Sequence, residues 1–283
     1  MGQGSVWSIA IYTGTSPLCT SPAPGIRTPV LTAENVHHTN ASFVADPFMV
    51  HRDGLWHLFC EVKKERIRDA EIGLATSADG LHWEWQGPVL AEPFHLSYPL
   101  VFESGGEYYM TPETLARQAV ILYRATRFPD RWEPVAKLVD GVLADPTPFQ
   151  FNGRWYLYAC GTPHQHDSLR LYHADSLLGP WEEHPCSPLI TDDKTQTRPG
   201  GRTIVWESAP IRFAQDCVPV YGTRVRAFRV SELTADRYAE AEVPESPILF
   251  PDAEWNATGM HHIDPHLVDG KWIACVDGYV YIE

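Results

Sequence analysis

The chain has 283 residues, of which 22 are basic and 36 acidic, so its formal net charge at pH 7 is −14. This excess of negative charge argues against nucleic acid as a partner, because a phosphate backbone would be repelled. The sequence contains no apolar run of about eighteen residues, the length that predicts a membrane span. Its first residues lack the charged and apolar regions of a signal peptide, so we expect a cytoplasmic protein.

A hairpin that begins at Asp46-Pro47 is the first structural signal along the chain. A strand is predicted after the proline, Asp53-Gly54 is typical of a tight turn, and alternating bulky residues predict a second strand. In three copies this second strand ends 15 residues after the residue that precedes proline, at Glu61, Glu113 and Cys160. All five copies start at Asp46-Pro47, Tyr98-Pro99, Asp145-Pro146, Arg198-Pro199 and Asp264-Pro265, separated by 52, 47, 53 and 66 residues. A period near fifty residues, built of short strands, predicts a β-propeller.

Two further strands follow each of the first four hairpins. The third strands are predicted at residues 71–76, 119–124, 169–173 and 224–228, and the fourth near 83–84, 132–133, 181–182 and 238–240. Only six residues follow Asp277 in the fifth copy, so we expect residues 5–31 to complete the last blade, with its fourth strand ending at 28–31. This closure would remove exposed sheet edges. We therefore predict an all-β fold, one five-bladed β-propeller domain of four-stranded blades over residues 1–283.

The starts of the innermost strands converge around the axis of a propeller. The residues before the five prolines should therefore form one ring, made of Asp46, Tyr98, Asp145, Arg198 and Asp264. Carboxylates crowded together raise one another's pKa and cost stability unless they are used. We therefore predict a functional site at the mouth, which we define as the end of the axis where the inner strands begin. A structural role as a turn former stays the alternative, most of all for Asp264.

Other side chains are expected to face the same mouth. His95, Tyr98, Arg198 and Arg202 are candidates to hold sugar hydroxyls or an anionic group, although an arginine among carboxylates also serves as a counter-ion. Trp255 lies in an irregular segment and is the candidate for stacking on a sugar ring. The sequence contains no GxSxG, HExxH, phosphate-binding glycine loop or dinucleotide fingerprint that would indicate a different chemistry.

Several motifs, spread over nearly the whole chain, resemble a known family of propellers. They are Phe43 to Phe48 (FVADPF), Glu92 to Pro99 (EPFHLSYP), Met110 to Glu113 (MTPE), Arg198 to Arg202 (RPGGR), Ala214 to Cys217 (AQDC), and Trp255 to Gly259 with His261-His262. On these motifs the chain resembles the N-terminal propeller domain of glucosamine inositolphosphorylceramide transferases and its stand-alone bacterial relatives. The Ala-Asp-Pro-Phe motif and the five-blade count also resemble the wider superfamily around glycoside hydrolase family 43.

The resemblance to family 43 implies roles for the carboxylates. There a first-blade aspartate is the general base, a third-blade aspartate tunes its pKa, and a glutamate that opens the fourth blade is the acid, so Asp46 matches the base and Asp145 the tuner. The acid does not match, because Arg198 stands where the fourth blade opens. Glu113 and Asp216 end second strands and are the substitutes, with Glu113 preferred. For either, capping a loop through backbone amides is the structural alternative.

The same resemblance bears on metals. In family 43 a histidine near the start of the fifth blade helps to hold a central hydrated calcium, which implies a calcium at the propeller axis with His262 as its candidate ligand. The residues around His261 and His262 do not form a zinc site with three or four clear ligands. We expect no cofactor to be required.

These observations favour a glycoside hydrolase-like enzyme. It would act on a glycosidic bond, with a furanosidic bond among the candidates, by an inverting mechanism in which one carboxylate activates water and a second protonates the leaving oxygen. The absence of the fourth-blade glutamate supports two alternatives: a glycan-binding propeller without catalysis, and an enzyme that transforms a sugar or natural product without hydrolysis. The expected partner is a carbohydrate or a glycosylated small molecule, Asp264 and His262 are candidate contacts to it, and the oligomeric state stays open.

Overall fold

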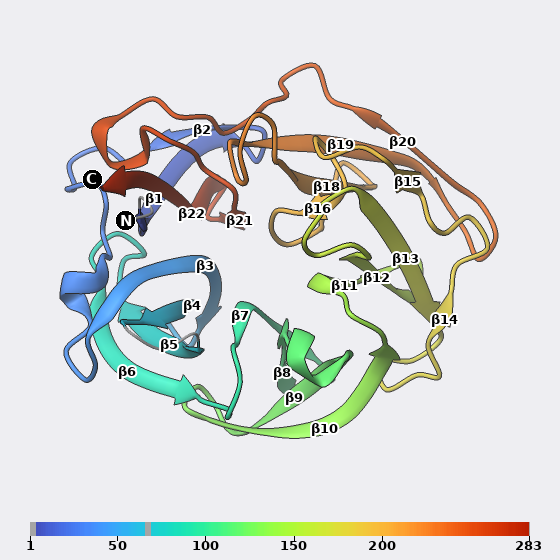
Figure 1. Cartoon of the computed structure of the whole chain (residues 1–283), viewed down its shortest axis with the longest axis horizontal. Helices are drawn as coiled ribbons and strands as arrows, with labels where there is room; N and C mark the ends of the chain where they lie inside the picture. Colours follow the sequence, from blue (N-terminus) through green and yellow to red (C-terminus); the bar gives the residue numbers. More distant parts are fainter. Residues whose placement is uncertain (1–3, 66–68, 283) are drawn as a thin grey trace.

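A computed structural model describes residues 4–65 and 69–282 of the chain. These residues form five antiparallel sheets that stand around a common axis, each with its first strand innermost (Figure 1). Apart from strands, they contain three short 3-10 helices: η1 (Ala33–Asn35), η2 (Leu115–Arg117) and η3 (Glu254–Asn256). The prediction of an all-β, five-bladed propeller with four-stranded blades is confirmed.

The blades follow the predicted repeat in chain order. Blade 1 contains β3 (Ala41–Arg52), β4 (Leu55–Lys64), β5 (Ala70–Ser77) and β6 (Glu84–Leu90), and blade 2 contains β7 (Ser97–Ser104), β8 (Glu107–Glu113), β9 (Ala119–Arg127) and β10 (Arg131–Asp140). Blade 3 contains β11 (Ala144–Phe151), β12 (Arg154–Cys160), β13 (Ser168–Ala174), and both β14 (Glu182–Glu183) and β15 (Ile190–Thr191) beside β13. Blade 4 contains β16 (Arg198–Pro199), β17 (Ile204–Trp206), β18 (Ala209–Asp216), β19 (Arg224–Leu233) and β20 (Tyr238–Glu242).

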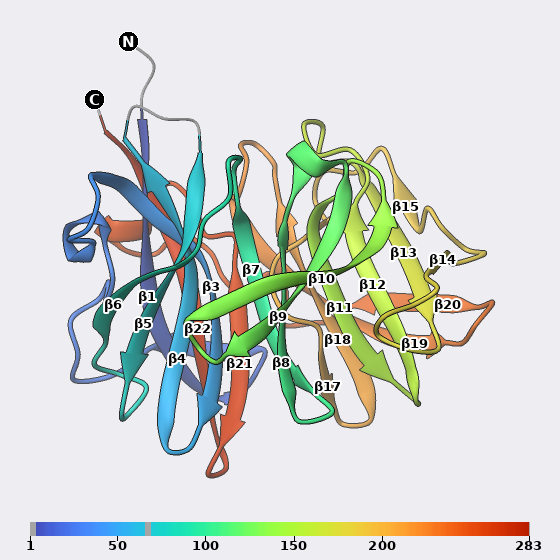
Figure 2. The same ribbon diagram turned by 90° about the horizontal axis from the view of Figure 1, so that it is seen from below.

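Blade 5 closes the ring with both ends of the chain. It contains β21 (Ile263–Val268), β22 (Lys271–Ile282), β1 (Gly4–Ser16) and β2 (Cys19–Pro22), in that order from the axis outward. β1 pairs with β22 over its length, from Gly4 opposite Ile282 to Gly14 opposite Trp272. The outer strand is β2 and not residues 28–31 as predicted, because only Leu31 of that segment pairs, in an isolated bridge to Ile9. Figure 2 shows the two termini together at one end of the ring and the β3–β4 and β21–β22 turns at the other.

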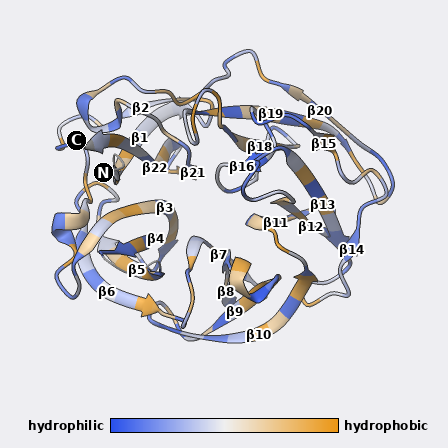
Figure 3. Cartoon of the chain, viewed as in Figure 1, coloured by the Kyte–Doolittle hydropathy of each residue, from blue (hydrophilic) through white to orange (hydrophobic). Residues whose placement is uncertain are grey.

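Apolar side chains from neighbouring blades pack between the sheets. One cluster joins blades 5 and 1 through buried Ile11, Cys275, Trp56 and Leu58, and another joins blades 4 and 5. Along the outer strands β6 and β10, hydrophobic and hydrophilic residues are interspersed (Figure 3), as expected for strands with one face in water.

None of the helices in the described part of the chain has the length and apolar character needed to cross a membrane.

Three of the five blade starts share an unusual backbone. Asp46, Tyr98 and Asp145 have φ values of 52°, 49° and 52°, and at each one the register between the first two strands shifts, as in a β-bulge. Residues other than glycine rarely adopt this left-handed conformation, which costs about 1–3 kcal/mol and persists only where the surroundings hold it. The other two starts differ in backbone, since the pairing of Asp264 is regular and β16 contains only Arg198-Pro199.

The axis below the three bulges is closed by a buried ion pair. Arg202 donates from Nε to Asp264 Oδ1 at 2.6 Å, and from Nη2 to the carbonyls of Met49 and Val101. Asp264 also accepts from the amide of Met49 at 2.6 Å and from His266. Arg202 and Asp264 thus join blades 1, 2, 4 and 5 in the interior, which is a structural role.

Replacing Arg202 should destabilise the fold strongly. Arg202→Met leaves the fully buried Asp264 carboxylate without its counter-ion, and removing one partner of a buried pair costs about 3–5 kcal/mol. Urea denaturation, followed by circular dichroism, measures this loss. As a control, Arg237→Met removes an exposed pair with Glu232 and should change the free energy of unfolding by less than about 1 kcal/mol. Equal effects of the two substitutions would contradict this account.

Candidate functional site at the propeller mouth

Five carboxyl side chains gather at the mouth, where inner strands begin and second strands end. They belong to Asp46, Glu61, Glu113, Asp145 and Asp277, and all five residues are at most 7% exposed. Burying this many acidic groups together costs free energy unless hydrogen bonds and opposite charges satisfy them. We call this group the carboxylate ring, and its contacts show which members are satisfied and which are not.

Three carboxylates of the ring bind backbone amides of the next blade. Asp277 Oδ2 accepts from the amide of Asp46 at 2.9 Å, and Asp46 Oδ2 accepts from the amide of Tyr98 at 3.1 Å. Glu113 Oε2 accepts from the amide of Asp145 at 3.2 Å. Each amide belongs to one of the three bulged residues, so each strained start is held by a carboxylate of the preceding blade. This supports the structural alternative for Glu113.

Arg198 neutralises one side of the ring. Its Nε and Nη2 donate to the two oxygens of Asp145, at 2.6 and 3.3 Å, and Nη2 also lies 3.4 Å from Glu113 Oε2. Gln215 adds a hydrogen bond to Asp145 at 2.9 Å. The geometry of Arg198 is therefore that of a counter-ion, the alternative that the sequence left open.

Asp46 has one oxygen that the described residues leave without a hydrogen bond. Its Oδ1 lies 3.8 Å from Nε2 of His261 and 3.9 Å from Nδ1 of His262, both too long for a hydrogen bond. The ring of His261 is oriented by Asp277, whose Oδ1 lies 2.8 Å from Nδ1. Asp46 therefore presents an acceptor between two imidazoles, at a distance that leaves room for water or a ligand group.

The ionisation of the ring follows from its burial. Burial raises the pKa of Asp46 to about 7 against the opposing charge of His261, and burial also raises the pKa of Asp145 to about 7 against that of Arg198. Burial, reinforced by the charge of Asp46, raises the pKa of Glu61 well above its usual range. Burial opposes the charge on His261, but Asp277 outweighs it and raises the pKa of this imidazole. Burial therefore favours the protonated forms of Asp46, Asp145 and Glu61, whereas the charges of His261 and Arg198 oppose this for the two aspartates.

Glu61 and Asp277 of the ring, and the neighbouring His261, were not among the predicted site residues. Glu61 lies 15 residues after Asp46, the same spacing that selected Glu113, so the repeat itself contained the signal. The predicted His95 lies beside it, with Nε2 at 3.4 Å from Glu61 Oε1. Asp277 was recognised as the end of the fifth copy, but it follows Asp264 by 13 residues and not by the 15 that selected Glu113.

Two predicted residues lie apart from the open oxygen of Asp46. Asp216 is buried in ion pairs with Arg224 and Arg226, at 3.2 and 2.8 Å, because the side chains of β18 alternate and Gln215 points to the axis instead. Tyr98 is fully buried, and its hydroxyl contacts Thr147 Oγ1 at 2.8 Å and Gly201. Tyr98 therefore crosses the axis and joins blades 2, 3 and 4.

Trp255 is partly buried and packs against a core cluster. A Cβ added to Gly278 would meet the ring of Trp255 at 2.8 Å, and this ring packs against the apolar cluster of blades 4 and 5. The stacking role predicted for Trp255 gains no support from this position.

The residues around Asp46 were tested as a metal site. One donor atom from each of Asp46, His261 and Asp277 lies within 4.8 Å of the others, and both ring nitrogens of buried His262 have no hydrogen-bond partner among the described residues. Calcium prefers six to eight oxygen ligands, whereas both oxygens of Asp277 already accept hydrogen bonds. Among the described residues of this group, Oδ1 of Asp46 and the ring nitrogens of His262 are the donors that stay free for a cation.

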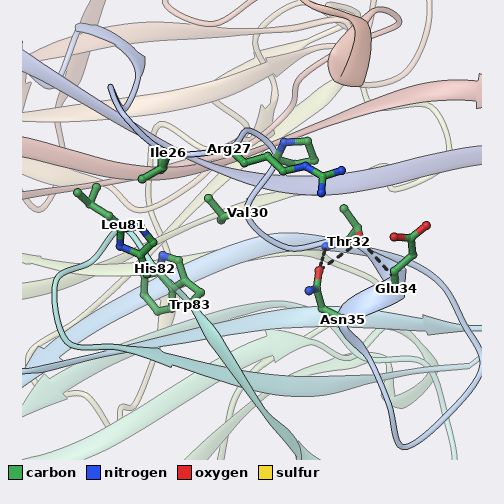
Figure 4. A pocket seen from close by; sticks show the side chains of 10 residues that line it. Ile26, Arg27, Val30, Thr32, Glu34, Asn35, Leu81, His82 and Trp83 are labelled. Atoms are coloured by element: carbon green, nitrogen blue, oxygen red, sulfur yellow. Dashed lines mark hydrogen bonds between the residues drawn. The ribbon is translucent and has the colours of Figure 1, made fainter.

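A separate pocket of about 330 Å³ lies outside the axis (Figure 4). Thr32 and Asn35 face it but are hydrogen-bonded to one another around the start of η1. Glu34 is the one carboxylate among its lining residues, so the pocket has no pair of carboxyl groups. Its lining residues are Ile26, Arg27, Pro29, Val30, Thr32, Glu34, Asn35, Leu81, His82 and Trp83.

The chain matches, over residues 2–279, the family described as Glucosamine inositolphosphorylceramide transferase 1, N-terminal. It is 36% identical over 303 residues to glucosamine inositolphosphorylceramide transferase 1 of Oryza sativa subsp. japonica, covering 98% of this chain and 40% of that protein. Identity to the Arabidopsis thaliana protein of the same name is 32% over 301 residues, covering 98% and 39%. The chain thus spans about two fifths of the length of these relatives.

Solved structures with the same fold are propellers of carbohydrate enzymes. A putative glycoside hydrolase from Parabacteroides distasonis superposes with a TM-score of 0.71 at 12% identity, covering 94% of this chain and 98% of that one. The family 117 glycoside hydrolase Zg3597 from Zobellia galactanivorans gives 0.56 at 17%, covering 83% and 84%. A β-1,2-mannobiose phosphorylase from Listeria innocua gives 0.66 at 13%, covering 94% and 96%. At these identities the likeness shows the fold alone.

The raised pKa of Asp46 predicts a pH-dependent gain in stability for Asp46→Asn. A carboxyl whose pKa is higher in the folded state than its unfolded value near 4 loses stability as the pH rises from about 4 to about 7. The variant escapes this loss, so above pH 7 it should unfold with a free energy roughly 1–3 kcal/mol higher, with the gain fading below pH 4. Urea denaturation from pH 4 to 8 measures it. Asp53→Asn, at an exposed turn, should show no such trend. A gain of equal size at all pH values would refute the assignment.

Proposed function

The chain belongs to the family described as Glucosamine inositolphosphorylceramide transferase 1, N-terminal, and we propose that it cleaves a glycosidic bond at the mouth of its propeller. The observation that carries the proposal is Asp46, a buried carboxyl with one oxygen left open between two imidazoles. Burial of an acid that is not satisfied by a partner is typical of functional sites. The fold shared with propeller carbohydrate enzymes supports a sugar as the substrate.

The proposed mechanism is hydrolysis with inversion. In its ionised form, Asp46 takes a proton from a water molecule as that water attacks the anomeric carbon, and a carboxylic acid gives a proton to the leaving oxygen. Asp145, which is held by Arg198, adjusts the electrostatic potential at Asp46 and so the pKa of the base. A hydrated calcium beside His262, where present, would add positive charge to the same field.

The sequence has no match for the family's acid, and the contacts of the two candidates favour Glu61 over the predicted Glu113. Glu113 already accepts from the amide of Asp145 and contacts Arg198. The pKa of Glu61 is raised well above its usual range by burial, which favours the protonated form that a general acid needs. It also lies on β4 beside the mouth, because its pairing partner Ala45 directly precedes Asp46.

The activities named for similar proteins set the alternatives. The plant relatives are named as transferases but are about two and a half times as long as this chain, so their reaction is not assigned to it. The Listeria propeller is named as a phosphorylase, which makes attack by phosphate instead of water the non-hydrolytic alternative. A cytoplasmic location stays a prediction.

A panel of 4-nitrophenyl α- and β-furanosides and pyranosides, with and without phosphate, tests the proposal. We expect one glycoside to be cleaved with inversion, followed by NMR, and Asp46→Asn to reduce kcat by about a hundredfold or more. Glu61→Gln should reduce kcat similarly and remove the alkaline limb of the pH profile, whereas Asp216→Asn should leave that limb in place.

Three results would redirect the proposal. Cleavage only with phosphate makes the protein a phosphorylase. Loss of the alkaline limb in Glu113→Gln, but not in Glu61→Gln, restores Glu113 as the acid. If no glycoside on the panel turns over while a sugar still binds, the propeller is a binding module and the hydrolase proposal is wrong.

A further inference from the structure

The loop between β18 and β19, residues 217–223, reaches over the mouth and carries an aromatic side chain there. We propose that this residue, Tyr221, is the platform on which the sugar stacks, the role that the sequence assigned to Trp255. The inference rests on the proposed function, because it places the sugar at the carboxylate ring.

The ring of Tyr221 lies among residues of three blades. The guanidinium carbon of Arg198 lies 5.1 Å from the centre of this ring, and the imidazole of His166 lies 5.0 Å away. On the blade 5 side, His261 lies at 5.4 Å and Trp7 at 6.3 Å, both edge to face. Tyr221 therefore contacts His261, which lies beside Asp46. It also contacts Arg198, the counter-ion of Asp145.

The position of Tyr221 is fixed by its backbone. Its carbonyl accepts from the hydroxyl of Tyr279 at 2.9 Å. The next residue, Gly222, has a φ of +67°, and a Cβ there would lie 3.0 Å from both His261 and Trp7. Because only glycine fits this close approach without strain, the loop packs tightly on blade 5 and holds the tyrosine in place. A preorganised aromatic side chain binds a ligand without losing much conformational entropy.

Tyr221 nevertheless keeps surface for a ligand. It is 36% exposed, whereas the aromatic side chains below it, Trp7 and Tyr98, are 5% and 0% exposed. A sugar ring has an apolar face of C–H groups, and aromatic rings bury such faces favourably while polar side chains bind the hydroxyls. In this arrangement Asp46 and His95 lie within the mouth as hydrogen-bonding groups, and Tyr221 covers the apolar face.

Binding of methyl glycosides, which lack an aromatic aglycone, tests the inference. The probes are the methyl forms of the glycosides on the panel, titrated by calorimetry into wild type, Tyr221→Ala, Tyr221→Phe and Asp46→Asn. Tyr221→Ala should weaken binding by about tenfold or more, and Tyr221→Phe should retain affinity within about threefold because the ring is kept. Phe250→Ala, at an exposed aromatic outside the mouth, is the control and should change nothing.

The outcomes separate the inference from the proposed function. Circular dichroism first checks that Tyr221→Ala is folded. If this variant binds a methyl glycoside as well as wild type does, the assignment of Tyr221 as the stacking platform is wrong, while the proposed function stands. Retained binding by Asp46→Asn, together with its loss of turnover, supports the placement of the sugar above Asp46. If wild type neither binds nor cleaves any probe, the proposed function and the platform fail together.

Discussion

The structure depends on hydrogen bonds in which a backbone amide of one blade donates to a carboxylate of the preceding blade. Asp277, Asp46 and Glu113 each accept from the amide of a bulged residue that is held in a left-handed conformation. A β-propeller has no hydrogen bonds between its sheets by default, so these contacts fix how blades 5, 1, 2 and 3 meet at the axis. The same contacts require acidic side chains to be buried together, and this burial raises the pKa values of Asp46, Asp145 and Glu61.

The carboxylates of the ring therefore divide by how fully they are satisfied. Glu113 and Asp145 share Arg198, and Asp277 is occupied by His261 and the amide of Asp46. Asp46 accepts one amide hydrogen bond and keeps an oxygen open, and Glu61 has a pKa well above its usual range. Asp46 and Glu61 lower the stability of the fold because their burial is not fully compensated, whereas the rest of the ring is neutralised. Such a loss of stability at a few groups is expected where a site serves a function. This division is why we place the chemistry at Asp46.

Much of the fold could be predicted because the repeat of the blades is visible in the sequence. Five X-Pro hairpins at a period near fifty, and a fifth copy too short for four strands, were enough for the propeller and its closure. The site was harder, because convergence on an axis says which residues meet but not how each side chain is used. The repeat could not show that Asp264 pairs without a bulge, that alternation along β18 turns Asp216 away, or that Tyr98 fills the axis. Tyr221 lies in a loop, where no periodicity applies.

The most direct test of this account is the titration of Asp46 itself, by NMR of protein labelled with carbon-13 at the aspartate carboxyls. Asp46→Asn identifies the signal by its disappearance. The account predicts a midpoint near pH 7 for this signal, because burial outweighs the nearby imidazole of His261. It predicts a further rise in His261→Asn, which removes that opposing charge. A midpoint near 4 in the folded wild type would mean that burial does not disfavour the ionised form of Asp46, and would contradict its assignment as the incompletely satisfied, reactive carboxyl.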